Sequence, residues 1–150
     1  MNPTKYDVHN ISRRLDAALR LVDKDEGVIP ENRKLILEFD RYILSLGIKQ
    51  ERRYKYLNQL RWLSKALGKP FPQAVKEDMI RVVGGIEKED ITEWSKVDRK
   101  VAIKRFYKWL KCDDDSYPPE VRWFRCRIKN DRCVLPEQLL TEEDVKKLAA

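Results

Sequence analysis

Apolar residues recur at helical spacing along most of the chain, and polar residues fill the positions between them. This pattern predicts five main helices, over residues 5–24, 30–46, 50–67, 74–88 and 95–111. Gly27, Gly47 and Gly68 follow three of these stretches and are typical helix-ending residues. Pro30 suits a first helical position. No strand-like alternation runs beyond a few residues, so we expect an all-α fold, a compact bundle of four to five short helices with a leading helix.

Several boundaries can be predicted in more detail. The pair Gly84-Gly85 should bend or end the fourth helix, because each glycine costs about 1 kcal/mol relative to alanine. Ser95 and Asp98 resemble a capping box, so the fifth helix should begin near Ser95, with Trp94 packed just before the cap. After the DDDSYPP break, residues 120–130 fit either a short helix or an extended piece.

The end of the chain has a different character. Thr141 caps a helix whose apolar stripe consists only of Val145 and Leu148, too few residues to form a core. We therefore expect the last ten residues to begin a further domain. The predicted organisation is a leading helix and connector (1–28), a helical domain (29–112), a turn and interdomain linker (113–140), and the start of that further domain (141–150).

Positive charge is concentrated in two of the predicted helices. The chain carries a net charge of +7, yet residues 49–69 and 94–111 each hold seven Lys or Arg against a single acid. In the second segment every fourth residue is lysine, which forms a ridge along one helix face: Lys96, Lys100, Lys104 and Lys108. Like charges at this spacing repel by a few tenths of a kcal/mol per pair. Two basic helices on an otherwise acidic chain indicate a nucleic-acid partner, the alternative being two solvated faces.

Other classes of function have little support in the sequence. No apolar run approaches the ~20 residues of a membrane span, and the first residues lack an apolar signal region, so a cytoplasmic protein is expected. The three cysteines lack the close pairs of a zinc site, which leaves burial as the better interpretation. The run Asp113–Asp115 could bind a divalent cation but more simply solvates a loop. With no acid–base pair or Gly-rich phosphate loop, we expect no catalytic residues, metal, cofactor or small-molecule substrate.

Three motifs resemble one family. They are KVAIKRFYKWL (100–110), the YPPEV turn (117–121) and LPEQLLTEEDVKKL (135–148). Over about residues 30–150 the chain is similar to the N-terminal core-binding domain of archaeal tyrosine recombinases, the phage-type integrases. The resemblance implies a SAM-like helical bundle, double-stranded DNA as partner, and contacts with other recombinase subunits. The family's catalytic Arg, His-x-x-Arg and Tyr would follow residue 150, and His9, the single histidine, fits none of these roles. The chain should therefore bind DNA without cutting it.

The same resemblance implies that helices 50–67 and 95–111 face the duplex. Candidates for base edges or nearby phosphates are Arg52, Arg53, Lys96, Arg99 and Lys100. Candidates for phosphate contact or general attraction are Arg61, Lys65, Lys104 and Lys108. Lys55 is a further DNA-binding candidate, and Ser95 lies where a helix start could meet a phosphate. Changing Lys96, Lys100 and Lys104 to glutamate should abolish binding and leave the helical content intact. The alternative function is a helical protein-interaction or oligomerisation module, with residues 5–24 as its surface.

Overall fold

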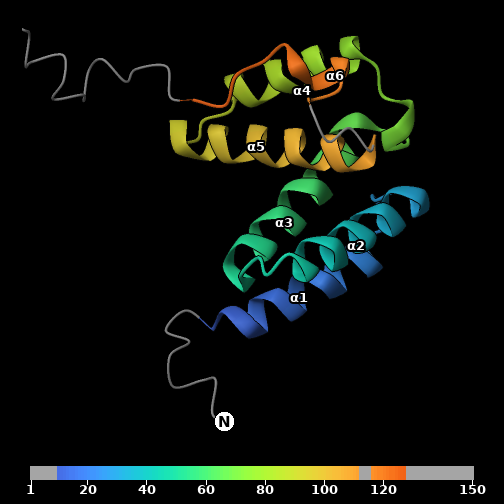
Figure 1. Ribbon diagram of the computed structural model, residues 1–150, viewed down its shortest axis with the longest axis vertical. Helices are drawn as coiled ribbons and strands as arrows, with labels where there is room; N and C mark the ends of the chain where they lie inside the picture. Colours follow the sequence, from blue (N-terminus) through green and yellow to red (C-terminus); the bar gives the residue numbers. More distant parts are fainter. Residues whose placement is uncertain (1–9, 112–115, 128–150) are drawn as a thin grey trace, which may run out of the picture.

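The computed structural model describes residues 10–111 and 116–127, and within them the all-α prediction is confirmed. Figure 1 shows six α-helices, which with one short 3-10 helix (η2) are α1 (Ile11–Lys24), α2 (Pro30–Ser45), α3 (Gln50–Leu67), η2 (Phe71–Gln73), α4 (Lys76–Lys88), α5 (Glu93–Leu110) and α6 (Pro119–Arg122). Over the described residues, the bounds predicted for the first three helices agree closely with those of α1, α2 and α3.

α3 is the central helix, and it contacts α1, α2, α4 and α5. α1, α2 and the first part of α3 form a lower layer in Figure 1, and α4, α5 and α6 form an upper one. Leu15, Ala18 and Val22 of α1 are buried in the same hydrophobic core as the other helices. The predicted leading helix is therefore an integral part of the bundle, because its apolar stripe is used against α3.

Glycine ends two of the lower helices, as the sequence predicted. Gly47 follows α2 with a φ of +79°, and the N–H of Ile48 donates to the Ile43 carbonyl at 3.1 Å. The Gly47 N–H donates to Leu44 at 2.9 Å, which completes a Schellman motif. Gly68 ends α3 with a φ of +68°. Both positions need the left-handed conformation that glycine adopts without strain.

Two predicted boundaries are wrong. α4 runs without interruption through Gly84 and Gly85 to Lys88, because its buried residues Met79, Val82, Val83 and Ile86 form a continuous stripe that outweighs the glycine cost. α5 begins before Ser95, at Glu93. The side chain of Thr92 is its cap and accepts a hydrogen bond from the Ser95 N–H at 3.2 Å.

Trp94 consequently lies in the first turn of α5 and is 69% exposed, so it does not pack ahead of a cap as predicted. The turn is held by polar contacts alone, since the Thr92 hydroxyl also donates to the Ser95 hydroxyl at 3.0 Å.

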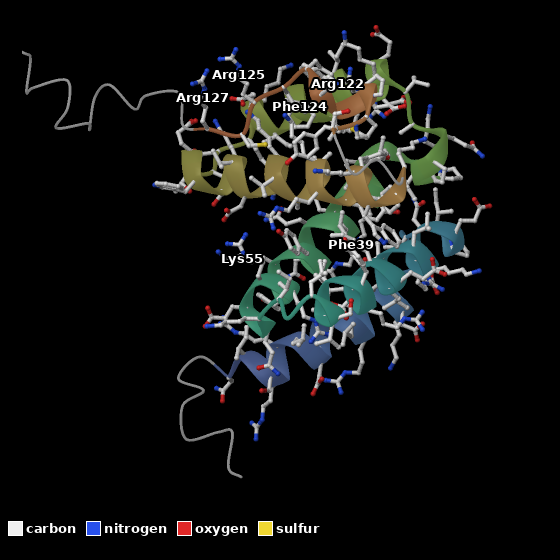
Figure 2. The ribbon with its side chains drawn as sticks, viewed as in Figure 1. Phe39, Lys55, Arg122, Phe124, Arg125 and Arg127 are labelled. Atoms are coloured by element: carbon white, nitrogen blue, oxygen red, sulfur yellow. The ribbon has the colours of Figure 1, made fainter. Side chains whose placement is uncertain are left out.

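An aromatic cluster joins the two layers at the C-terminal half of α5. Phe39 of α2 meets Phe106 edge-on, with ring centroids 5.4 Å apart, and lies 5.4 Å from Trp109. Phe71 of η2 packs against Phe106 at 4.7 Å, and the buried Tyr107 hydroxyl donates to the Phe71 carbonyl at 2.9 Å. Figure 2 shows Phe39 between the layers. The cluster fixes this end of α5 to the lower layer.

A buried asparagine fixes the connection after α3. The Asn32 amide donates to the Ser64 hydroxyl and the Lys69 carbonyl, each at 3.0 Å, and its oxygen accepts from the Phe71 N–H at 2.8 Å. A fully buried amide needs such partners, because an unpaired polar group costs about 1–3 kcal/mol.

Several predictions lie outside the described residues. These are the linker beyond residue 127, the helix capped by Thr141, the Asp113–Asp115 run, His9, Cys112 and Cys133. Within the described ranges, no helix is long and apolar enough to span a bilayer.

Candidate nucleic-acid interface

The lysine ridge of α5 lies mostly inside the fold. The Lys96 ammonium donates to the Glu87 carbonyl at 3.1 Å and to the Glu93 carboxylate at 3.2 Å. Lys100 is buried and forms an ion pair with the Glu87 carboxylate. Glu87 at the end of α4 and Glu93 at the start of α5 therefore offset the repulsion between these lysines within the protein.

Aromatic rings cover the other half of the ridge. The Lys104 ammonium lies 5.0 Å from the ring centroids of both Tyr117 and Phe124, and the Lys108 ammonium lies 5.3 Å from Tyr117. Each is a cation–π contact, in which the negative face of the ring attracts the ammonium. Both rings belong to the segment that includes α6, which packs on α5 and α4.

The lysine ridge is covered because α5 lies between two sets of helices. α3 packs on one face of α5, and α4 and α6 pack on the other. The buried residues of α5 are accordingly Lys100, Ala102, Ile103, Phe106 and Tyr107. Val97 and Val101 of the same helix are only half-buried.

Two further candidates are paired within the domain. Arg53 is buried and holds Asp40 of α2 through two hydrogen bonds, at 3.0 and 2.7 Å. Arg99 forms an ion pair with Glu89 and stacks its guanidinium 4.4 Å from the centroid of the Trp62 ring. These contacts tie α2 to α3, α4 to α5 and α3 to α5.

Lys65 is more exposed but also has a partner. Its ammonium lies 2.5 Å from Asp25 in the turn after α1. The pKa of the Asp25 carboxyl is lowered, chiefly by this hydrogen bond from Lys65 and also by the Gly27 N–H. Lys65 therefore fastens the α1–α2 connection to the end of α3.

A groove of about 390 Å³ lies between the α2–α3 turn, the first half of α3 and the first half of α5. Its lining residues are Gly47, Ile48, Lys49, Glu51, Arg52, Lys55, Tyr56, Gln59, Asp98 and Val101. The groove thus lies between the two layers, and Tyr56 in its lining packs edge-on against Phe39 of the aromatic cluster. Of the predicted site residues it contains Arg52 and Lys55.

Three exposed cations line the α3 side of this groove. The side chains of Lys49 and Arg52 make no hydrogen bond or ion pair among the described residues, and the side chain of Lys55 is 61% exposed. The Lys55 ammonium reaches 3.6 Å from Asp98 on the opposite wall, and Figure 2 shows its side chain pointing outward. An exposed ion pair of this kind contributes about 0–1 kcal/mol. These three side chains can therefore turn to an anion outside the protein.

The groove also contains an unsatisfied polar group. Tyr56 lines it and is 4% exposed, and its hydroxyl has no hydrogen-bond partner among the described residues. The hydroxyl is enclosed, and the ring packs edge-on against Phe39 at 5.8 Å, so Tyr56 supports the wall of the groove rather than contacting a ligand.

The structure therefore divides the predicted residues into two groups. Arg52 and Lys55 lie together at the groove. The others are held by internal contacts, namely Arg53, Lys65, Ser95, Lys96, Arg99, Lys100, Lys104 and Lys108. Sequence reasoning missed Lys49, Tyr56 and Gln59 as groove residues. The clearest signal for Lys49 was its place directly before α3, one turn from Arg52 and Arg53.

Comparisons of the chain with protein families, curated proteins and solved structures found no match. The likeness to integrases consequently rests on the three sequence motifs.

Proposed function

We propose that the protein binds double-stranded DNA through the groove between α3 and α5, as the core-binding module of a tyrosine recombinase does. The observation that carries this proposal is the cluster of Lys49, Arg52 and Lys55 on one wall of the groove. Of the three, only Lys55 has an acidic partner within the described residues, and that contact is exposed. Cations in this state can exchange water and counterions for phosphates.

The direction of α3 agrees with this role. Lys49 and Arg52 occupy the N-cap and first turn of the helix, where the helix dipole favours anions, and Lys55 lies in the following turn. Most contacts should be to phosphate, with Gln59, half-buried in the groove, as the polar group able to read a base edge.

The binding experiment is fluorescence anisotropy of the full chain with a labelled 25-base-pair duplex over a salt series. We expect log K to fall linearly with log salt. Changing Lys49, Arg52 and Lys55 to alanine should reduce the slope by about 2.7, since each phosphate contact contributes about 0.9. The matched control changes Arg20, Lys24 and Lys34, three exposed cations of α1 and α2, and should retain the slope.

Absence of binding at low salt would overturn the proposal, as would an equal loss in the two triple variants. Equal competition by polyglutamate would show attraction to any polyanion and would also contradict the duplex proposal.

The alternative, a protein-interaction module, has one observation in its favour. Leu44 and Leu46, at the end of α2 beside the groove, are 51% and 59% exposed. The surface predicted for that role, the leading helix, has its apolar stripe buried against α3. A concentration-dependent dimer in light scattering, lost on changing Leu44 and Leu46 to serine, with no binding to DNA, would support this alternative.

A further inference from the structure

A short segment carries exposed arginines on the far side of α5 from the groove. Residues 116–127, which we call the strap, contain α6 and the extended piece that follows it. The strap covers Lys104 and Lys108 of the lysine ridge, and its own cations, Arg122, Arg125 and Arg127, are exposed. The ammonium groups of the ridge thus contact other parts of the protein, and the arginines of the strap are the exposed cations on this side of α5.

The strap is firmly held against α5. Val121 and Phe124 are buried, with exposures of 0% and 5%. The Phe124 and Tyr117 rings receive the Lys104 ammonium. Hydrogen bonds stiffen the strap internally, from the Arg122 guanidinium to the Tyr117 carbonyl at 2.9 Å and from the Trp123 indole to the Glu120 carbonyl at 2.8 Å.

The end of the strap alternates inward and outward side chains. Phe124 is buried, Arg125 exposed, Cys126 half-buried and Arg127 exposed. Burial also raises the pKa of the Cys126 thiol, as expected for a side chain that packs inward. Arg125 and Arg127 make no hydrogen bond or ion pair among the described residues, so both guanidinium groups are available to a partner.

Figure 2 shows Arg125 and Arg127 above the N-terminal half of α5 and Lys55 below it, on the same edge of the molecule. Exposed cations therefore flank the N-terminal end of α5 on both sides, where positive charge attracts the phosphates of a duplex.

We infer that the strap is a second phosphate-binding surface, so that Arg125 and Arg127 grip the same duplex as Lys49, Arg52 and Lys55. The inference rests on the proposed function and adds to it a second wall and the residues that form it. Because the strap's backbone is fixed by its buried side chains, the backbone itself loses little conformational freedom on binding. The first turn of α5, with its exposed Trp94, lies between the two walls and is the part of the helix that enters the major groove of the DNA.

The test compares Arg125→Ala/Arg127→Ala with the unchanged chain in the salt series. We expect the salt slope to fall by about 1.8, with one duplex bound per chain in both proteins. The helical signal and melting temperature should be unchanged, since neither side chain has an internal partner. Arg125→Lys/Arg127→Lys should retain the slope, because lysine preserves the charge. The control Arg20→Ala/Lys24→Ala on α1 removes equal charge elsewhere.

Three results would overturn the inference. One is an unchanged slope in Arg125→Ala/Arg127→Ala while the groove variant loses slope; the proposed function would then stand without the strap. Another is a slope loss that the control on α1 reproduces, which would indicate net charge alone. The third is two duplexes bound per chain, which would separate the strap from the groove. Failure of the unchanged chain to bind would instead defeat the proposed function itself.

Discussion

The ammonium of Lys104 lies 5.0 Å from the Tyr117 ring centroid and 5.0 Å from that of Phe124. A residue predicted to attract DNA thus holds the strap to α5. Each cation–π contact contributes about 0.5–1 kcal/mol, and more where water is excluded. Lys104 is partly buried beneath the strap, so its charge acts on the fold more directly than on a ligand.

Replacing Lys104 with methionine should therefore lower the free energy of unfolding. Methionine keeps much of the side chain's length and removes the charge, and we expect a loss of about 1–2 kcal/mol in urea unfolding. Arg105→Met is the matched control, because Arg105 is exposed on the same helix and makes no contact of this kind among the described residues. Equal losses in the two variants would show that the rings do not stabilise Lys104.

The triple change of Lys96, Lys100 and Lys104 to glutamate should now unfold the domain. Sequence reasoning expected its helical content to survive. In the structure, however, Lys96 and Lys100 both contact Glu87, and Lys100 is buried. Breaking a buried ion pair typically costs about 3–5 kcal/mol, and the new carboxylates would face an existing one.

The measurement is the far-ultraviolet circular dichroism of the triple variant during heating. A groove variant with Lys49, Arg52 and Lys55 changed to glutamate introduces the same charge at exposed positions, so it should melt near the unchanged protein. A triple ridge variant that melts normally would contradict the internal position of the ridge.

Acid should weaken the connection between α3 and α4 through Asp78. The pKa of this carboxyl is lowered below 3.8, chiefly by the Val75 N–H and then by the Lys69 ammonium at 2.9 Å. A group whose pKa is lower in the folded state stabilises fully above its unfolded pKa. Its contribution is then lost as the pH falls through the folded value.

We therefore expect the stability of the protein to fall below about pH 3.8 and Asp78→Asn to flatten that dependence. Urea unfolding at pH 3 and pH 6 measures the difference. Glu77→Gln, at the neighbouring exposed position of α4, is the control. An identical acid dependence in Asp78→Asn and the unchanged protein would contradict the role of the Val75 and Lys69 contacts.

Local patterns predicted the helices well, because helix ends depend on neighbouring residues. Gly47 and Gly68 are the clearest cases, since the backbone at each needs a positive φ. The start of α5 was misplaced because Thr92 and Ser95 are both good caps, and nothing local chooses between them. The run through Gly84 and Gly85 depends on burial of the opposite face of α4, a tertiary effect.

The candidate site was harder to predict, because charge patterns do not reveal what covers a helix. The spacing of Lys96 to Lys108 correctly indicates one face, but Glu87, Tyr117 and Phe124 approach that face from distant parts of the chain. Arg52 and Arg53 are neighbours in the same helix, but the side chain of Arg53 points toward Asp40 on another helix and that of Arg52 lines the groove. Which cations remain free is therefore a property of the packing.

The contact between Lys55 and Asp98 gives a direct test of the groove. Asp98 draws the Lys55 ammonium across the groove, at 3.6 Å, and adds negative charge where phosphate is proposed to bind. Asp98→Asn should release Lys55 and remove that repulsion. We expect tighter binding of DNA and a salt slope larger by up to about 1, the contribution of one added phosphate contact. The free energy of unfolding should change by less than about 1 kcal/mol, because the pair is exposed.

Glu51→Gln is the matched control for Asp98→Asn. It makes the same change of charge in the same groove, at a residue without an ion pair among the described residues. Anisotropy titrations at three salt concentrations would compare the two variants. A larger gain in Asp98→Asn indicates that the released Lys55 contacts phosphate. Equal gains would indicate a general electrostatic effect, and no gain in either variant would place the DNA away from this groove.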